Sequence, residues 1–232
     1  MINNDDDHQR YHVEETIHQE ARNELVPSSN NDEVHPNNLD DVVEARKEIT
    51  LPVLEYGYRT VPCSWDELVD ILLHQKILAK LSRSEEQQYI YELYKQKVLL
   101  QWETMTDYVL YTKFPNVFTK VESTSVAVDS SQSQLQQRRW KIDPPVESIS
   151  TTRLALVKND FPYYMENDIE HWILWKLGGD SINDLDFDNA KRDLCMNHNM
   201  LEDCIIHWVN PIHLKSLPNI EHAHFLGRVK MQ

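Results

Sequence analysis

The sequence contains no apolar run long enough to cross a bilayer. A membrane helix needs roughly 20 mostly apolar residues, but the best candidate, LVDILLHQKILAKL, is interrupted by Asp70, His74, Gln75 and Lys76. The N-terminus, MINNDDDHQR, also lacks the basic start and apolar core of a secretory signal. We therefore expect a cytoplasmic or nuclear protein that has no membrane partner.

Cysteine is scarce, and no two cysteines are closely spaced. The sequence has only Cys63, Cys195 and Cys204, and no two of them form a CxxC motif. An odd number of cysteines without paired spacing favours neither a disulfide framework nor a zinc knuckle. We expect reduced thiols.

Basic residues are outnumbered by acidic ones. The chain has 23 Lys and Arg against 38 Asp and Glu, a formal net charge of -15. Because binding to a phosphate backbone depends on clustered Lys and Arg, this balance argues against nucleic acid as the main partner. The acidic excess is concentrated in residues 1–60, which hold 14 acidic and 5 basic residues. A local cationic pocket in the remainder is compatible with this distribution.

The N-terminal segment has almost nothing to bury. Stretches such as NNDDDH and PSSNNDEVHPNNLDD are rich in Asn, Asp, Glu and Ser, a composition typical of disorder. We predict a disordered acidic tail over residues 1–50 and a single α+β domain over 51–232. The tail histidines are interpreted as solvated side chains rather than metal ligands: His8, His12, His18 and His35.

The first part of the domain, residues 64–114, has helical patterning. Ser64 and Ser84 each stand three residues before a Glu or Gln, which is the spacing of a capping box. We predict a helix after each serine, the second running until Pro115, so that the two form a helical hairpin. One apolar stripe along the second helix is interpreted as core: Tyr91, Tyr94, Val98 and Trp102.

The rest of the domain changes character twice. Residues 120–150 include the Ser- and Gln-rich stretch ESTSVAVDSSQSQLQQ and are predicted to form a mobile insertion. Residues 153–229 then contain four short segments that alternate in polarity, RLALVKND, DIEHWILWKL, CIIHWVN and NIEHAHFLGRV, with one helix-length segment between the second and third. The predicted fold class is α+β: an acidic tail, a helical hairpin and a four-stranded antiparallel sheet with one inserted helix.

Four histidines fall on three of the predicted strands. Because side chains alternate between the two faces of a strand, His222 and His224 share a face, and His171 and His207 each have a definite face on their own strands. If these faces coincide, all four imidazoles converge on one surface. A shift of one residue in register would separate them.

Three interpretations of this cluster remain open. A His-x-His pair with a third histidine from a neighbouring strand is a geometry found in zinc sites. Alternatively, one imidazole could attack phosphorus or transfer a proton near neutral pH. The third interpretation is structural, with the rings hydrogen-bonded to backbone or to carboxylates such as Glu170 and Glu221.

Two loops add polar candidates next to the histidines. NDFPYY places an amide, a carboxylate and a phenol at a sheet edge, and WVNPIHLKSLP places an amide, a cation and a hydroxyl just before the paired histidines, a plausible phosphate cradle. A plain tight turn and a solvated lysine are the alternatives. The candidate ligand-binding residues are Asn159, Asp160, Tyr163, His171, His207, Asn210, Lys215 and Ser216, and the candidate catalytic residues are His222 and His224.

Three long segments resemble a known family. SWDELVDILLHQKILAKLSRSEEQQYIYE, LVKNDFPYYMENDIEHWILWKL and IIHWVNPIHLKSLPNIEHAHFL are similar to the N-acetylglucosamine-induced protein 1 family, a largely fungal group. The resemblance covers about residues 60–227, although Tyr164 stands where the family has a glycine in a WPYG-like turn. It implies induction in organisms that respond to amino sugars, and it supplies no reaction.

A more distant resemblance concerns the histidines themselves. The HWILWK strand and the loop with Ser216 look like those of histidine-triad nucleotide hydrolases and transferases, in which the middle residue of a His-x-His-x-His strand attacks the α-phosphate. Here Ile220 and Leu226 stand where a third histidine would be, so the nucleophile is left open between His222 and His224.

Two hypotheses about function follow. In the first, the protein binds a nucleotide or nucleotide sugar and has phosphoester hydrolase or transferase activity. In the second, it is a non-catalytic regulatory or scaffold protein in the amino-sugar response, which uses Trp172, Trp175 and Trp208 to bind a partner or sugar. The sequence identifies no cofactor, no metal and no protein partner.

Overall fold

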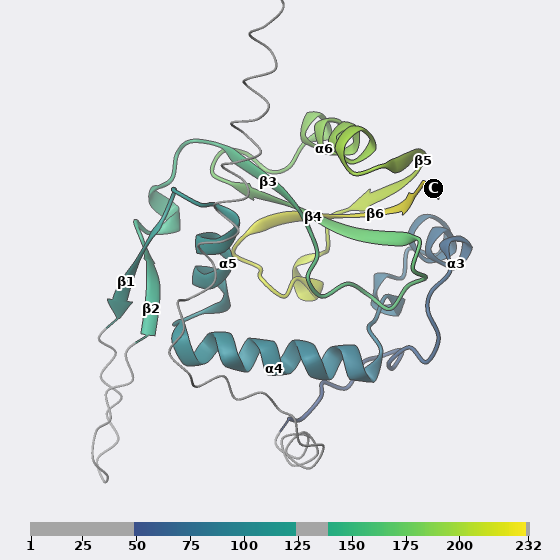
Figure 1. Ribbon diagram of the computed structural model, residues 1–232, viewed down its shortest axis with the longest axis horizontal. Coiled ribbons are helices and arrows are strands. Elements are labelled where there is room, and N and C mark those ends of the chain that lie inside the picture. The colour runs from purple at the N-terminus through teal and green to yellow at the C-terminus, as the bar shows by residue number, and fades with distance from the viewer. Residues whose placement is uncertain (1–48, 124–138, 231–232) are drawn as a thin grey trace, which may run out of the picture. The chain divides into compact units, whose positions relative to one another are not determined.

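The computed structural model describes residues 49–123 and 139–230, all within one compact unit, Glu48–Gln232 (Figure 1). The predicted disordered tail lies outside the described residues except for its last two positions, and the middle of the predicted insertion also lies outside them. Within the described part of the chain, no helix is both long and apolar enough to cross a membrane.

A four-stranded antiparallel sheet forms the centre of the fold, as predicted. Its strand order is β3-β4-β6-β5, so the last strand pairs with β4 rather than lying at an edge. β4 and β6 are therefore central and nearly all their residues are buried, which explains why both are rich in aromatic and apolar residues. The strands are Arg153–Lys158 (β3), Ile169–Leu177 (β4), Met200–Trp208 (β5) and Glu221–Val229 (β6).

The inserted helix, α6 (Asp184–Asn197), covers one face of this sheet. It begins at a capping box in which Asn183 and Asp186 satisfy each other's backbone N–H groups. Its buried Leu194 packs with Trp172 and Phe225 from the central strands. We call this side of the sheet the α6 face. The predictions of the α+β class and of one inserted helix are confirmed.

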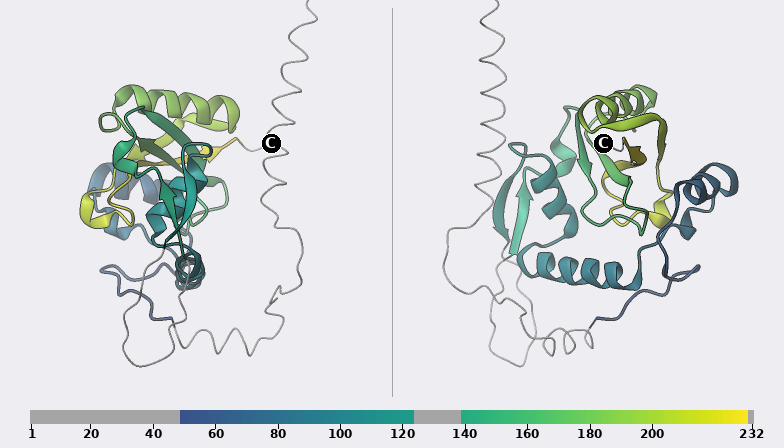
Figure 2. Two further views of the ribbon diagram at one scale, coloured as in Figure 1. Left: turned by 90° about the vertical axis from the view of Figure 1, so that its left-hand side faces the viewer. Right: turned by 45° about the vertical axis from the view of Figure 1, so that its right-hand side comes forward.

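The N-terminal helices lie on the opposite side of the sheet from α6 (Figure 2). Ser64 caps α3 (Trp65–Val69), which continues as a π-helical segment, Asp70–Gln75. After a 3-10 turn, Leu78–Lys80, the capping box at Ser84 opens α4. Both predicted capping positions are therefore used.

The prediction of one long second helix is wrong. The structure has two helices, α4 (Glu85–Gln101) and α5 (Met105–Lys113), because Trp102 is extended with φ -115° and ψ 148°. Thr104 then accepts a hydrogen bond from the backbone N–H of Asp107 and caps α5 as a new helix. This break turns α5 toward the sheet.

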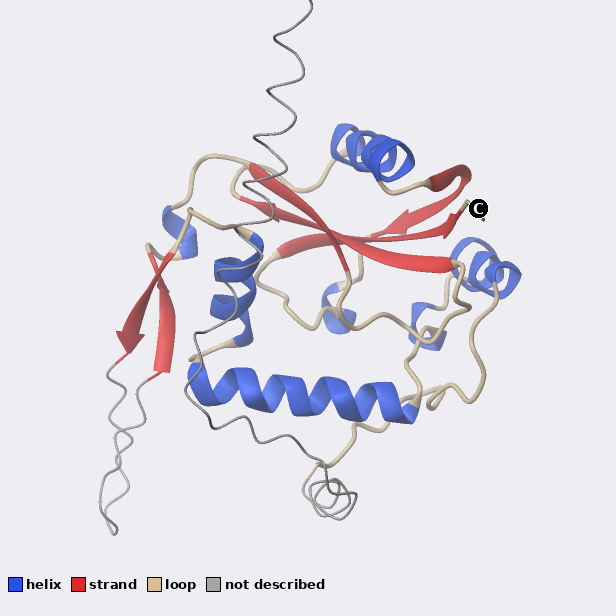
Figure 3. Cartoon of the chain, in the orientation of Figure 1, coloured by secondary structure: helices blue, strands red, loops and turns tan. Residues whose placement is uncertain are grey.

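The predicted insertion is not entirely irregular. Its two ends form a separate antiparallel pair, β1 (Thr119–Ser123) and β2 (Arg139–Asp143), beside α5 (Figure 3). Ile142 of β2 joins the apolar core, which ties this pair to the domain. A 3-10 turn, Val146–Ser148, follows.

Two separate apolar clusters cover the face opposite α6. Ile173 and Trp175 of β4 pack in a cluster with α4, α5 and β2, whereas Ile169 and Leu226 pack in a second cluster with α3 and the π-helical segment. His171 lies between Ile169 and Ile173 on the same face and belongs to neither cluster. The middle of this face is therefore where polar side chains and a cavity are found.

Candidate functional site

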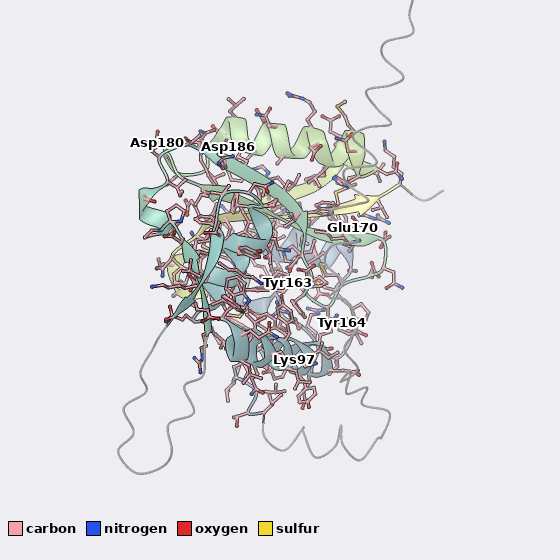
Figure 4. The ribbon with its side chains drawn as sticks, turned by 60° about the vertical axis from the view of Figure 1, so that its left-hand side comes forward. Lys97, Tyr163, Tyr164, Glu170, Asp180 and Asp186 are labelled. Atoms are coloured by element: carbon pink, nitrogen blue, oxygen red, sulfur yellow. The ribbon has the colours of Figure 1, made fainter. Side chains whose placement is uncertain are left out.

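A cavity of about 620 Å³ lies between the sheet and the N-terminal helices. Its walls come from β4, β6, α4, α5 and the loops after β3 and β5, with residues 52–55 completing the lining. Figure 4 shows Tyr163 among the side chains between the sheet and α4, and Asp186 on the other side near α6. The cavity thus brings together segments far apart in the sequence.

Three of the four predicted histidines lie on the sheet face that lines this cavity. In the register of β4 and β6, Ile173 pairs with His224, and Trp175 pairs with His222. His171, two residues before Ile173, therefore points to the same side as both, and all three imidazoles line the cavity. We call this side of the sheet the histidine face.

His207 does not join them, contrary to the prediction. Trp208 pairs with His224, which places Trp208 on the histidine face and His207 on the α6 face. There the His207 ring stacks on Phe187 of α6, with ring centroids 4.2 Å apart. Convergence fails at this strand because the register of β5 and β6 pairs Trp208, and not His207, with His224.

A chain of polar contacts at hydrogen-bond distance runs through two of the cavity histidines. Asn159 Nδ2 lies 3.1 Å from His171 Nδ1, His171 Nε2 lies 2.9 Å from His224 Nδ1, and His224 Nε2 lies 3.0 Å from Asn210 Nδ2. Both ring nitrogens of His224 are therefore occupied. The chain uses an amide from each of the two loops that the sequence singled out.

Aromatic rings hold these two imidazoles in place. Tyr163 stacks on His171 with centroids 4.9 Å apart, and Trp208 stacks on His224 with centroids 5.1 Å apart. Burial, with the neighbouring imidazole as a second cause, holds the pKa of His171 well below its usual 6.5. Burial, followed by the charge of His222, lowers the pKa of His224 to about 3. Both rings are therefore neutral near pH 7.

His222 is arranged differently from His224. Its Nδ1–H donates to the backbone oxygen of Ile220 at 2.8 Å, so the lone pair of the neutral ring is on Nε2. Among the described residues, no hydrogen-bond partner is found for this Nε2. Burial lowers the pKa of His222, which favours the neutral ring. His222 is thus the cavity histidine with a ring nitrogen available to a ligand.

Arg83 supplies a positive charge that sequence reasoning missed. Its Nε and Nη2 donate to the backbone oxygen of Phe161, at 3.1 and 2.7 Å, and its Nη1 donates to Gln88 Oε1. The guanidinium lies 4.3 Å from the ring centroid of Tyr91. No carboxylate of the described residues lies within ion-pair distance of it. No spacing or motif distinguishes this arginine, which stands just before the helix cap Ser84.

The aromatic stripe of α4 has two roles. Val98 and Trp102 belong to the core, as predicted. Tyr91 and Tyr94, two turns and one turn before Val98, line the cavity and pack on Phe161, with ring centroids 5.2 and 4.6 Å away. These two tyrosines therefore form part of an aromatic wall of the cavity.

The remaining predicted residues divide into cavity and non-cavity positions. Asp160 and Ser216 are exposed and line the cavity, and Asp160 Oδ2 is 3.1 Å from Lys113 Nζ. Lys215 is not part of the lining, because its Nζ is paired with Glu221 at 2.9 Å. Lys215, which was predicted to bind phosphate, is therefore paired with a carboxylate of the protein itself.

The described residues include no group of three or more His, Cys, Asp or Glu side chains arranged to hold a metal ion. Two of the tryptophans proposed for partner binding, Trp172 and Trp175, are only 7% and 5% exposed and lie on opposite faces of the sheet. They do not form a common surface.

Comparison with known proteins gives two matches. Residues 64–228 match the model of a family described as "Protein of unknown function (DUF3605)". A crystal structure of a protein named HTC1 is similar at 20% identity and a TM-score of 0.43, over 72% of this chain and 85% of that one, a distant match in fold. None of the curated proteins matches the chain.

Proposed function

Because the chain belongs to the DUF3605 family, a family of unknown function, we propose a function from the cavity itself: it binds a nucleotide or nucleotide sugar and catalyses hydrolysis or transfer at a phosphoester. In this proposal Arg83 binds phosphate, the aromatic wall contacts the base or sugar, and His222 is the reacting imidazole.

The charge of Arg83 is the first support. A guanidinium is well suited to phosphate because its planar N–H groups donate two parallel hydrogen bonds. Arg83 has five N–H hydrogens, and three of its nitrogens are already anchored to Phe161 and Gln88. It is held in place yet keeps N–H hydrogens for a ligand. In a chain of net charge -15, a half-buried cation that has no carboxylate of the described residues within ion-pair distance favours an anionic ligand.

The size and lining of the cavity are the second support. A volume of about 620 Å³ falls within the roughly 300–1,000 Å³ of small-molecule sites. Tyr91, Tyr94 and Phe161 provide ring faces for a planar base or the apolar face of a sugar. The resemblance to amino-sugar-induced proteins makes nucleotide sugars the first ligands to test.

The third support is the contrast between the two candidate nucleophiles. The two His224 nitrogens lie 2.9 Å from His171 Nε2 and 3.0 Å from Asn210 Nδ2, so neither is open for attack on phosphorus, whereas the Nε2 of His222 is available. In the proposed reaction this lone pair attacks phosphorus and the bond from phosphorus to the leaving-group oxygen breaks. That oxygen takes the electron pair, and water later releases the phosphoryl group from the ring. In this proposal His224 is not the attacking imidazole.

One observation carries the proposal: Arg83 and His222, whose Nε2 has no hydrogen-bond partner among the described residues, line the same cavity. The test is to incubate the full chain with a panel of nucleotides and nucleotide sugars, with and without chelator, and to measure turnover and thermal shift. His222→Gln is expected to abolish turnover while it retains ligand-induced stabilisation. His207→Gln, on the opposite face, is the matched control and is expected to behave as wild type.

The outcomes separate the hypotheses. Turnover that survives His222→Gln would remove this histidine from the chemistry. A thermal shift without turnover for any ligand would favour a non-catalytic binding protein. The absence of both a thermal shift and turnover with every ligand of the panel would contradict the proposal as a whole.

A further inference from the structure

The hydrogen-bond chain through the paired histidines has a fixed donor at each end. At the first end, the backbone N–H of Phe161 donates to Asn159 Oδ1 at 3.0 Å. A backbone N–H can only donate, so the Asn159 amide must present its oxygen to Phe161 and its NH₂ group to His171.

The other end is fixed in the same way. The indole Nε1–H of Trp208 donates to Asn210 Oδ1 at 2.8 Å, and an indole N–H is never an acceptor. The Asn210 amide must therefore present its NH₂ group to His224 Nε2. Both outer nitrogens of the histidine pair are approached by donors.

These two constraints leave two hydrogens without an acceptor. A neutral imidazole carries one N–H, and the outer nitrogens must accept. The hydrogen of His171 is then on Nε2 and that of His224 is on Nδ1, and these two nitrogens are the ones that lie 2.9 Å apart. Two donors thus face each other, and adding a proton to either ring would only add another donor.

Rotation of an Asn amide by half a turn moves the donor-to-donor contact to another place in the chain but does not remove it. Each of the four inner residues offers one donor side and one acceptor side, while both ends of the chain, Phe161 and Trp208, only donate. One of the five contacts must therefore be donor to donor, whichever way the amides and rings are arranged. An acceptor from outside the chain is required to satisfy it, since an unpaired buried polar group is costly.

We propose that the facing N–H groups of His171 and His224 are a donor site for a phosphoryl oxygen of the ligand, which separates the two rings and accepts from them. This proposal rests on the proposed function and assigns the contact that completes the site. With the amides oriented as the Phe161 and Trp208 N–H groups require, the donor-to-donor contact is the histidine pair, and both of its rings line the cavity.

The surroundings suit a phosphoryl oxygen in particular. The Arg83 guanidinium lines the same cavity, and its positive charge contributes to the lowered pKa of both histidines. In the proposal, the cation and the histidine pair therefore contact the same phosphate group. A water molecule can accept these hydrogen bonds in the ligand-free protein, but an anionic oxygen accepts more strongly. The site thus favours exchange of a bound water for phosphate.

The tautomers of the two rings provide the first test. In the full chain with ¹⁵N-labelled histidine, long-range ¹H–¹⁵N correlation spectra are expected to show the Nε2–H form for His171 and the Nδ1–H form for His224. Addition of inorganic phosphate or ADP is expected to shift both N–H resonances. The same tautomer in both rings would mean that an amide has turned over, and it would overturn the proposal.

Trp208→Phe provides the second test. Without the indole N–H, Asn210 is free to turn and accept from His224, so the chain is satisfied with no outside acceptor. We expect the hydrogen of His224 to move to Nε2 and the affinity for phosphate or ADP to fall about tenfold or more. Trp172→Phe is the matched control, since its indole N–H donates to Glu170 on the α6 face. Thermal unfolding of both variants checks that they fold.

The experiments distinguish failure of the donor site from failure of the proposed function. If nucleotides bind and turn over but neither imidazole N–H shifts and Trp208→Phe binds as wild type does, the donor site is wrong and the proposed function stands. If inorganic phosphate shifts both N–H groups but no nucleotide or nucleotide sugar binds, the donor site stands and the ligand class is wrong. If neither phosphate nor any nucleotide shifts the N–H groups, the donor site is overturned.

Discussion

The two faces of the central sheet are built from alternate residues of the same two strands, yet they are buried in different ways. On the α6 face, Trp172, Leu174 and Phe225 pack against an apolar helix surface. On the histidine face, His171 and His224 are equally inaccessible but are held by hydrogen bonds and stacked rings around a cavity. Apolar packing would stabilise this face more, because burying polar groups has a desolvation cost. This difference between the two faces is the reason that we place the proposed ligand site on the histidine face.

The strongest contrast is expected from Phe225→Ala on the α6 face. Phe225 is completely buried, so truncation leaves a cavity and is expected to lower the free energy of unfolding by about 3–5 kcal/mol. Urea denaturation measures this loss. Leu185→Ala, at a position 66% exposed on α6, is the control and should cost little. A loss below about 1 kcal/mol for Phe225→Ala would show that the α6 face is not tightly packed.

The histidine face is expected to make stability depend on pH. Burial lowers the pKa of His224 from 6.5 to about 3 in the folded protein, so between these values the unfolded chain binds a proton that the folded chain does not. The free energy of unfolding therefore falls as pH is lowered from 6.5 toward 3. Denaturation curves of wild type and His224→Gln across this range measure the effect. The variant is expected to have the shallower pH dependence, and equal slopes would contradict a buried neutral His224.

Substitution of Arg83, the cavity cation assigned to phosphate, should affect ligand binding more than folding. Arg83→Gln is expected to weaken nucleotide affinity by about 10- to 100-fold, since it deletes charge-assisted hydrogen bonds to phosphate. Calorimetric titration measures the affinity. The control is Lys113→Gln, which removes a cavity cation already paired with Asp160 and should have a much smaller effect. Equal losses in the two variants would indicate general charge attraction in place of a specific contact.

The smallest effect is expected at the histidine that lies on the α6 face. His207 is exposed and has no contact with the cavity. His207→Gln should change the free energy of unfolding by no more than about 0.5 kcal/mol and leave nucleotide affinity unchanged. A clear loss of affinity in this variant would mean that the assignment of the two faces is wrong.

The strands and α6 could be predicted from the sequence because alternation and helix caps are local features. The break at Trp102 was missed although the Thr104 to Asp107 spacing is a cap, because the aromatic and apolar residues around it continue a helical pattern. The sequence could not decide whether His207 shares a face with the other histidines, because register depends on pairing between distant strands. Arg83 could not be found, since its role comes from tertiary contacts with the loop at Phe161.

The most direct test of the account is a crystal structure of the full chain with a bound nucleoside diphosphate or nucleotide sugar. The expected result is a phosphate group between the histidine face and α4, in contact with Arg83 and near His222 Nε2, with one phosphoryl oxygen accepting from His171 or His224. A ligand bound elsewhere on the protein, with the histidine pair undisturbed, would contradict it.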